Sequence, residues 1–195
     1  MAWTQKITLT KSPKCLFVAD PDEQTTKLNP SLVEVPPYHI AVLLSLSLAE
    51  PQYCGSANYE QKHNIAVRHI ALTEIEAPPF KEAKRAAAFA DYFNQLGMDS
   101  VWIDSEGNVL GLLKGSEGMQ TVALDAHLDT VFPEGTDVKV KIKNDTLYAP
   151  GIGDDTRGLT MLLTLLETLK TNQIQPKDNV LFVGSVGEEG LGDLR

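Results

Sequence analysis

The stretch that decides the predicted fold is Thr121–Thr130, which reads TVALDAHLDT. It begins with the strand-forming run Val122 to Leu124 and ends with His127 and Asp129. An extended backbone places alternate side chains on one face, so the imidazole and the carboxylate lie on the same side. Helix-covered parallel sheets bind ligands at the carboxyl ends of their strands. A histidine and an aspartate at that position therefore favour a metal site.

A helix and a second strand follow this stretch. The helix carries a leucine stripe at helical spacing, formed by Leu159, Leu162, Leu163, Leu166 and Leu169. Asn179–Val186 (NVLFVGSV) is apolar on both faces, which is typical of a strand inside a parallel sheet. A right-handed crossover between the two strands brings residues 127–129, 154 and 188–189 to one sheet edge. The fold class predicted is α/β.

The segments that precede and follow the central stretch predict further elements. Helices are expected over Tyr59–Ile75 and from Phe80 to Gly97, with the rigid sequence Glu76-Ala77-Pro78-Pro79 between them. Short strands are expected over Ser100–Asp104 and Asn108–Lys114. Apolar residues alternate with lysines over residues 138–143, with Ile142 the last apolar one, and after Asn144-Asp145 residues 146–148 run back, which predicts a hairpin with one solvated face.

Two histidines of the first predicted helix, His63 and His69, have no acidic or cysteine partner at i+3 or i+4. We therefore interpret them as surface or half-buried residues rather than metal ligands.

Composition limits the classes of function. The 195 residues are 43% hydrophobic, which is enough for one sizeable core. Seventeen basic against 26 acidic residues give a net charge of -9, which argues against nucleic-acid binding. Cys15 and Cys54 form no CxxC motif and indicate neither a zinc knuckle nor a disulfide framework.

Residues 1–58 carry five prolines from Pro13 to Pro37 and no motif, so they are left as an unassigned N-terminal extension. Within them, residues 40–49 (IAVLLSLSLA) form an apolar run that is too short to span a bilayer. The run ends in small residues, as a signal peptide does, but about forty residues precede it without a basic cluster next to it. A buried helix or strand is the alternative. Localisation stays open: cytoplasmic by default, or exported if this run is a signal segment.

Each polar motif has an ordinary structural interpretation when taken alone. His127 and Asp129 could be a core histidine and a turn aspartate. The loop Gly151–Asp155 could be a flexible turn in which Asp155 or Thr156 caps the long helix. Glu188 and Glu189 could be a solvated strand end. Together at one sheet edge, however, these carboxylates repel one another unless cations lie between them.

Four segments in order resemble a known family, the dinuclear zinc exopeptidases and deacylases of peptidase family M20. They are residues 74–82 (EIEAPPFKE), 125–132 (DAHLDTVF), 149–158 (APGIGDDTRG) and 187–193 (GEEGLGD). The resemblance runs from about residue 60 to the end. It implies a three-layer α/β/α fold with a mixed, largely parallel sheet, and makes residues 59–195 the N-terminal portion of a catalytic domain.

The resemblance also implies a role for each matching residue. His127 would bind one zinc, Asp154 would bridge two zincs and Glu189 would bind the second. Asp129 would orient His127. Glu188 would be the general base that takes a proton from the attacking water. The Asp154–Asp155 peptide bond would be cis.

The sequence departs from the family pattern in two ways. Thr156 and Arg157 stand where relatives often have a lysine after the paired aspartates, which puts the role of that cation in doubt. Relatives also have an acidic ligand shortly after the glutamate pair and a final histidine near their C-terminus. Neither occurs up to Arg195, so we expect a truncated catalytic domain. Relatives often form homodimers through a domain that is absent here.

The resemblance thus implies metal-dependent hydrolysis of an amide bond in small peptides, by a hydroxide bound to two Zn²⁺ with Glu188 as the base. Co²⁺ or Mn²⁺ would fit similar ligands. One alternative is an N-acyl amino acid deacylase. An alternative of another class is a non-catalytic fragment that binds zinc weakly or not at all. No nucleic acid and no membrane span are expected.

Overall fold

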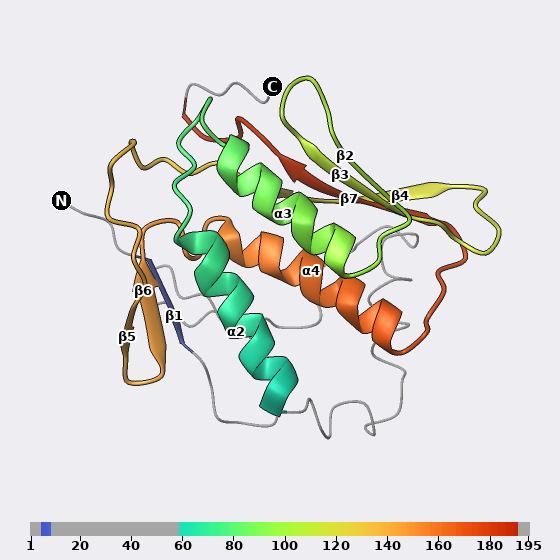
Figure 1. Ribbon diagram of the computed structural model, residues 1–195, viewed down its shortest axis with the longest axis horizontal. Helices are drawn as coiled ribbons and strands as arrows, with labels where there is room; N and C mark the ends of the chain where they lie inside the picture. The colour runs from blue at the N-terminus through green and yellow to red at the C-terminus, as the bar shows by residue number, and fades with distance from the viewer. Residues whose placement is uncertain (1–4, 9–58, 191–195) are drawn as a thin grey trace, which may run out of the picture.

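The computed structural model describes residues 5–8 and 59–190 (Figure 1). The main elements are α2 (Tyr59–Thr73), α3 (Ala83–Gln95), β2 (Ser100–Ile103), β3 (Val109–Leu113), β4 (Thr121–His127), α4 (Thr156–Thr171) and β7 (Asn179–Ser185). A smaller sheet contains β1 (Gln5–Thr8), β5 (Lys141–Lys143) and β6 (Thr146–Ala149). The predicted apolar run at residues 40–49 lies outside the described residues. None of the helices in the described part is long and apolar enough to cross a bilayer.

The larger sheet has the strand order β2-β3-β7-β4, and it is mixed. β4 and β7 are parallel, with Thr121 opposite Asn179 and His127 opposite Ser185. β3 pairs with β7 and with β2 in antiparallel orientation. The parallel pair confirms the predicted strand-helix-strand unit, and it brings the carboxyl ends of β4 and β7 to one edge.

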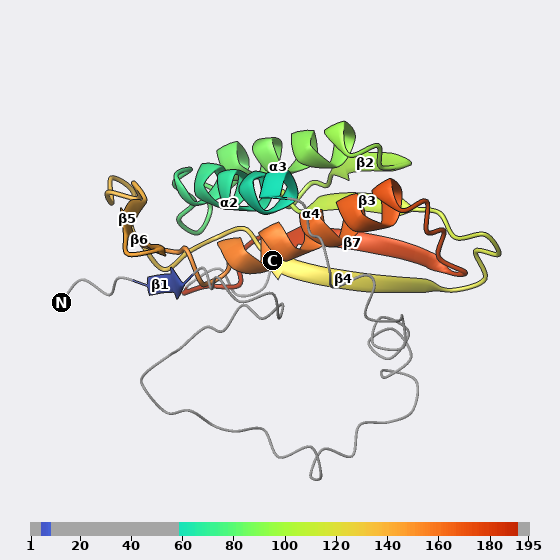
Figure 2. The same cartoon turned by 90° about the horizontal axis from the view of Figure 1, so that it is seen from below.

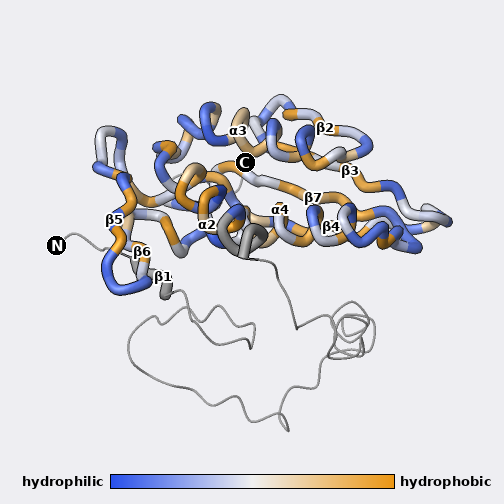
Figure 3. Tube along the Cα trace, turned by 60° about the horizontal axis from the view of Figure 1, so that its bottom comes forward, coloured by the Kyte–Doolittle hydropathy of each residue, from blue (hydrophilic) through white to orange (hydrophobic). Residues whose placement is uncertain are grey.

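Helices α2, α3 and α4 lie together on one face of this sheet (Figure 2). The core between them contains the predicted leucine stripe of α4, of which Leu159, Leu163 and Leu166 are fully buried. Each such side chain stabilises the fold by about 1.5–3 kcal/mol through burial. Hydrophobic residues occur along α4, β3 and β7, the elements that meet in this core (Figure 3).

Aromatic rings fill the space between α3 and the sheet. Phe89 and Phe93 of α3 have ring centroids 4.5 Å apart, and Phe93 meets Phe182 of β7 edge-on at 6.0 Å. Gly184 lies under Phe89, where a Cβ atom would come within 2.8 Å of the ring. A residue with a side chain would collide with this ring, so the strand needs glycine there.

The sheet is mixed and covered by helices, as the α/β prediction requires. Within residues 59–190, helices cover only one face, so the second helical layer of a three-layer fold is not among the described elements. Leu181 and Val183 alternate with Phe182 and Gly184 along β7 and therefore lie on the opposite face. They are half-buried.

The smaller sheet differs from the sequence prediction in detail. The observed hairpin is shorter than predicted and contains only β5 and β6. Its turn residues Asn144 and Asp145 both have positive φ. Ile142 lies on the apolar face of the predicted hairpin, yet it is 69% exposed. β1 was not predicted at all; it pairs with β6 in antiparallel orientation. The boundary placed at residue 58 stays a prediction.

Candidate metal centre

Three side chains from three separate segments meet at the carboxyl edge of the β4–β7 pair. His127 ends β4, Asp154 lies in the loop before α4, and Glu189 follows β7. Each offers one ligand atom, and these atoms all lie within 4.8 Å of one another. His127 Nε2 is 2.9 Å from an Asp154 carboxylate oxygen. The structure therefore brings together the three residues that the sequence predicted as metal ligands.

The loop that carries Asp154 is held by buried hydrogen bonds. The Thr156 hydroxyl donates to the Gly151 carbonyl at 2.8 Å, and the His69 Nε2–H donates to the Ile152 carbonyl at 2.7 Å. Gly151 has a φ of 70° and approaches Thr130 so closely that a Cβ atom would lie 2.7 Å from its methyl group. The peptide bond between Asp154 and Asp155 is cis, as the resemblance implied.

Asp155 connects the loop to both neighbouring elements. Its Oδ1 accepts the Gly158 N–H at 2.9 Å, which makes it the N-cap of α4, one of the two caps that the sequence predicted. Its Oδ2 accepts the N–H of His127 at 3.3 Å. One carboxylate therefore fixes the start of α4 relative to the end of β4.

Asp129 is completely buried and contacts the ends of both strands. Its carbonyl oxygen is 3.1 Å from His127 Nδ1, and its Oδ1 is 3.5 Å from the same nitrogen. The carboxylate also accepts the N–H of Glu188 at 3.1 Å and the N–H of Glu189 at 2.7 Å. Asp129 thus contacts His127, and the orienting role that the resemblance implies stays a prediction. The bonds to the Glu188–Glu189 backbone were not predicted.

The side chain of Glu188 is partly exposed and lies beside the three candidate ligands. Its side chain is 49% exposed, and its Oε2 lies 3.9 Å from His127 Nε2. The carboxylate is therefore within reach of a water molecule or a substrate that approaches the three-residue group.

The carboxylates around His127 favour a positive charge, which a proton or a metal ion can supply. Burial disfavours the protonated form of His127, but hydrogen bonds to Asp129 and Asp154 and the charge of Asp155 outweigh it and raise the pKa to about 9. Burial, and then the charge of Asp154, raise the pKa of Glu189. Burial also raises the pKa of Asp155. Carboxylates crowded in this way are stabilised by a cation between them, and one imidazole with two carboxylates is a donor set that zinc accepts.

Arg85 of α3 is a buried cation that was not predicted from the sequence. Its side chain is only 1% exposed, and its guanidinium donates to the carbonyls of Leu128 and Ile75. Burial lowers the pKa of Arg85 to about 10, against the attraction of Asp129, so it stays charged at neutral pH. A signal was present in the sequence: Arg85 stands four residues before Phe89, on the apolar stripe of its helix.

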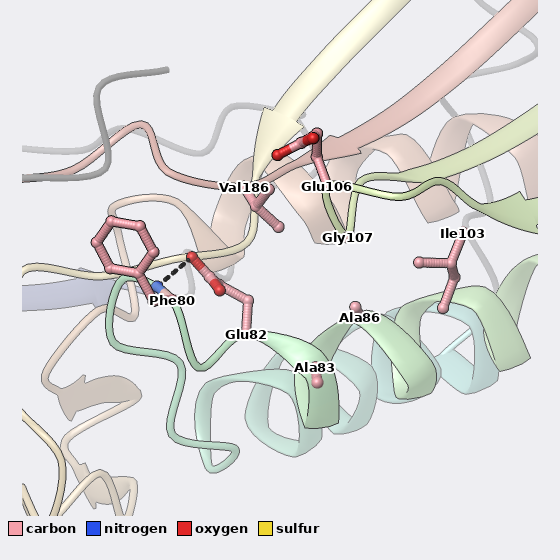
Figure 4. A pocket seen from close by; sticks show the side chains of 8 residues that line it. All are labelled: Phe80, Glu82, Ala83, Ala86, Ile103, Glu106, Gly107 and Val186. Atoms are coloured by element: carbon pink, nitrogen blue, oxygen red, sulfur yellow. Dashed lines mark hydrogen bonds between the residues drawn. The ribbon is translucent and has the colours of Figure 1, made fainter. Parts of the chain in front are cut away.

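A hollow of about 210 Å³ lies at the carboxyl end of β7, between α3 and the β2–β3 turn (Figure 4). Its walls include Phe80, Ile103 and Val186, with the carboxylates of Glu82 and Glu106 at its sides. None of the three candidate metal ligands lines it. The hollow and the three-residue group are therefore separate features of the described structure.

Comparison with known proteins gives the same assignment for this region. Residues 123–194 match the sequence profile of peptidase family M20/M25/M40. The uncharacterized protein YqjE of Bacillus subtilis (strain 168) is 28% identical over 131 residues, which are 62% of this chain and 35% of that protein. Carboxypeptidase G2 of Pseudomonas sp. (strain RS-16) is 31% identical over 84 residues, which are 42% of this chain and 20% of that protein.

A solved structure agrees with these sequence matches. The aminopeptidase PepT of Bacillus cereus ATCC 10987 superposes with a TM-score of 0.58 at 25% sequence identity. The match covers 66% of this chain and 37% of that chain. The chain therefore spans between 20% and 37% of the length of these relatives.

Proposed function

Because residues 123–194 are related to peptidase family M20, we propose that this protein hydrolyses amide bonds in small peptides with two zinc ions at the β4–β7 edge. The observation that carries the proposal is the convergence of His127, Asp154 and Glu189 within 4.8 Å. Peptide bonds are favoured over other amides because the related proteins include a carboxypeptidase and an aminopeptidase.

The three residues would share two metal ions. His127 would bind one ion, Asp154 would bridge both, and Glu189 would bind the second. Asp154 is suited to bridging because its side chain is 59% exposed and its carboxylate approaches His127. Asp129 would act on both sides of the site, since it holds His127 through Nδ1 and holds Glu189 through its N–H.

Bound zinc ions would polarise the substrate carbonyl and lower the pKa of a water molecule toward about 7. Glu188 would accept the proton of this water and later donate a proton to the leaving amine. Its backbone N–H is tied to Asp129, while its side chain stays half exposed. This arrangement fixes the position of the base and leaves its carboxylate free to transfer protons.

A zinc titration of the full chain by calorimetry tests the ligand assignment. We expect zinc to bind to the wild-type chain, and we expect binding to weaken strongly in His127→Asn and Glu189→Gln. Glu117→Ala is the control, because Glu117 is exposed and pairs with Lys177 near the start of β7, away from the site. A wild-type chain that binds no zinc would overturn the proposal and favour the non-catalytic interpretation.

Turnover tests the role of Glu188. Glu188→Ala is expected to keep zinc binding and to lose cleavage of a tripeptide, whereas Glu117→Ala keeps both. A Glu188→Ala chain with the wild-type kcat would refute the role of the base. Faster cleavage of an N-acetyl amino acid than of a tripeptide would replace the peptidase by a deacylase.

A further inference from the structure

We propose that Arg85 is a positioning residue for the metal centre, because its guanidinium donates a hydrogen bond to the carbonyl of Leu128, the residue between His127 and Asp129. Arg85 does not reach the metal ligands itself; it acts through the end of β4 and through the charge of Asp129. This inference rests on the proposed function, and its test separates the two.

The hydrogen bonds of Arg85 join two segments, the residue that follows β4 and the loop after α2. Nη1 donates to the Leu128 carbonyl at 2.7 Å, while Nε and Nη2 donate to the Ile75 carbonyl, with Nε at 3.1 Å. Ile75 belongs to the loop between α2 and α3. Two residues further along this loop, the Ala77 carbonyl accepts a hydrogen bond from the Thr130 N–H at 2.9 Å. The chain around Asp129 is therefore fixed on both sides.

The charge of Arg85 supports Asp129. The Asp129 carboxylate is 0% exposed and bonds to the N–H groups of Glu188 and Glu189 as an anion. A buried carboxylate is costly unless it is hydrogen-bonded and its charge is compensated. The Arg85 guanidinium attracts this carboxylate, and its bond to the Leu128 carbonyl fixes the backbone one residue before Asp129.

Burying a whole guanidinium in an apolar stripe is unfavourable for stability alone. An apolar side chain at position 85 would pack against the core without the desolvation penalty that a buried charge carries. The planar guanidinium, however, donates to two carbonyls at once, which a lysine ammonium on a flexible stem does less well. The geometry thus assigns Arg85 to the alignment of the strand end.

A cobalt titration of the full chain, read by visible absorption, tests this role. We expect Arg85→Met to bind Co²⁺ about 10–100-fold more weakly, which is the usual effect of losing an outer partner of a metal ligand. Arg85→Lys keeps the charge and should lie between Arg85→Met and wild type. The control is Arg68→Met: Arg68 is 11% exposed and bonds to Glu167 at 2.6 Å, so its loss lowers the Tm without reaching the site.

The comparison is made below the Tm of every variant, and each Tm is measured on the same samples. Cobalt affinity of folded Arg85→Met within twofold of wild type would overturn the proposal, as would an equal loss in Arg68→Met. If Arg85→Met does not fold, Arg85→Lys is tested alone and in an Asp129→Asn background. Its effect should shrink there because the partner charge is gone. An unchanged effect would overturn the route through Asp129.

The same titration distinguishes the two proposals. If His127→Asn and Glu189→Gln bind cobalt as wild type does, the metal centre itself is wrong. If they lose binding while both Arg85 variants bind normally, only the positioning role is wrong.

Discussion

Gly184→Ala introduces a single methyl group beneath the aromatic core. The new Cβ atom would lie 2.8 Å from Cδ1 and 2.9 Å from Cε1 of Phe89. Phe89 is fully buried and packs on Phe93, so its ring has no space into which it can retreat. Overpacking of this kind costs about 1–3 kcal/mol of unfolding free energy. For a chain of this size, that cost lowers the Tm by about 2–12 °C.

Urea denaturation followed by circular dichroism measures this loss. The matched background is Phe89→Leu, which removes the ring atoms that the new methyl group would touch. Gly184→Ala should cost at least about 0.5 kcal/mol less in that background than in wild type, because the two positions are in contact. An unfolding free energy of Gly184→Ala within about 0.3 kcal/mol of wild type would show that the core is looser than the structure indicates.

Three further predictions concern pH, packing and metal. Burial keeps the pKa of His69 below its usual value in the folded chain, so the unfolded chain binds more protons just below pH 6.5, and the unfolding free energy should fall as the pH drops through that range. His69→Gln should flatten this part of a curve of unfolding free energy against pH, and an equally steep curve would contradict the assignment. Leu163→Ala should lower the unfolding free energy by about 2–5 kcal/mol in urea, since Leu163 is fully buried between α4 and the sheet, whereas the exposed Met161→Ala on the same helix should change it little. Zinc at about 100 times its Kd should stabilise the chain by about 2.7 kcal/mol and raise the Tm by about 5–11 °C in calorimetry, and EDTA should reverse the shift; a Tm that is the same with zinc and with EDTA would argue against the metal centre.

The sequence predicted the elements whose patterns are local and strong. The leucine spacing of α4 and the two-sided apolar run of β7 each specify one element, and their order around β4 predicts the parallel pair. Because parallel strands end at the same edge, the meeting of His127, Asp154 and Glu189 could also be predicted from the order of these elements.

Other features depend on contacts between segments that are distant in the sequence. α3 begins at Ala83 rather than near Phe80, because Phe80 has a positive φ and Glu82 is the N-cap. His69 was expected at the surface or half-buried but is 3% exposed, because its ring bonds to the Ile152 carbonyl of the Gly151–Asp155 loop, 83 residues away. β1 pairs with β6 across more than 130 residues. No local sequence pattern predicts such partners.

The parallel pairing of β4 and β7 also has a consequence for the order of folding. The side chains that would hold metal come from positions 127, 154 and 189, so the centre exists only after α4 has folded across the sheet and both strands have paired. Non-local pairing of this kind is slow compared with helix formation. Metal capture should therefore lag behind the recovery of helical signal during refolding and report the moment at which the two strands come into register.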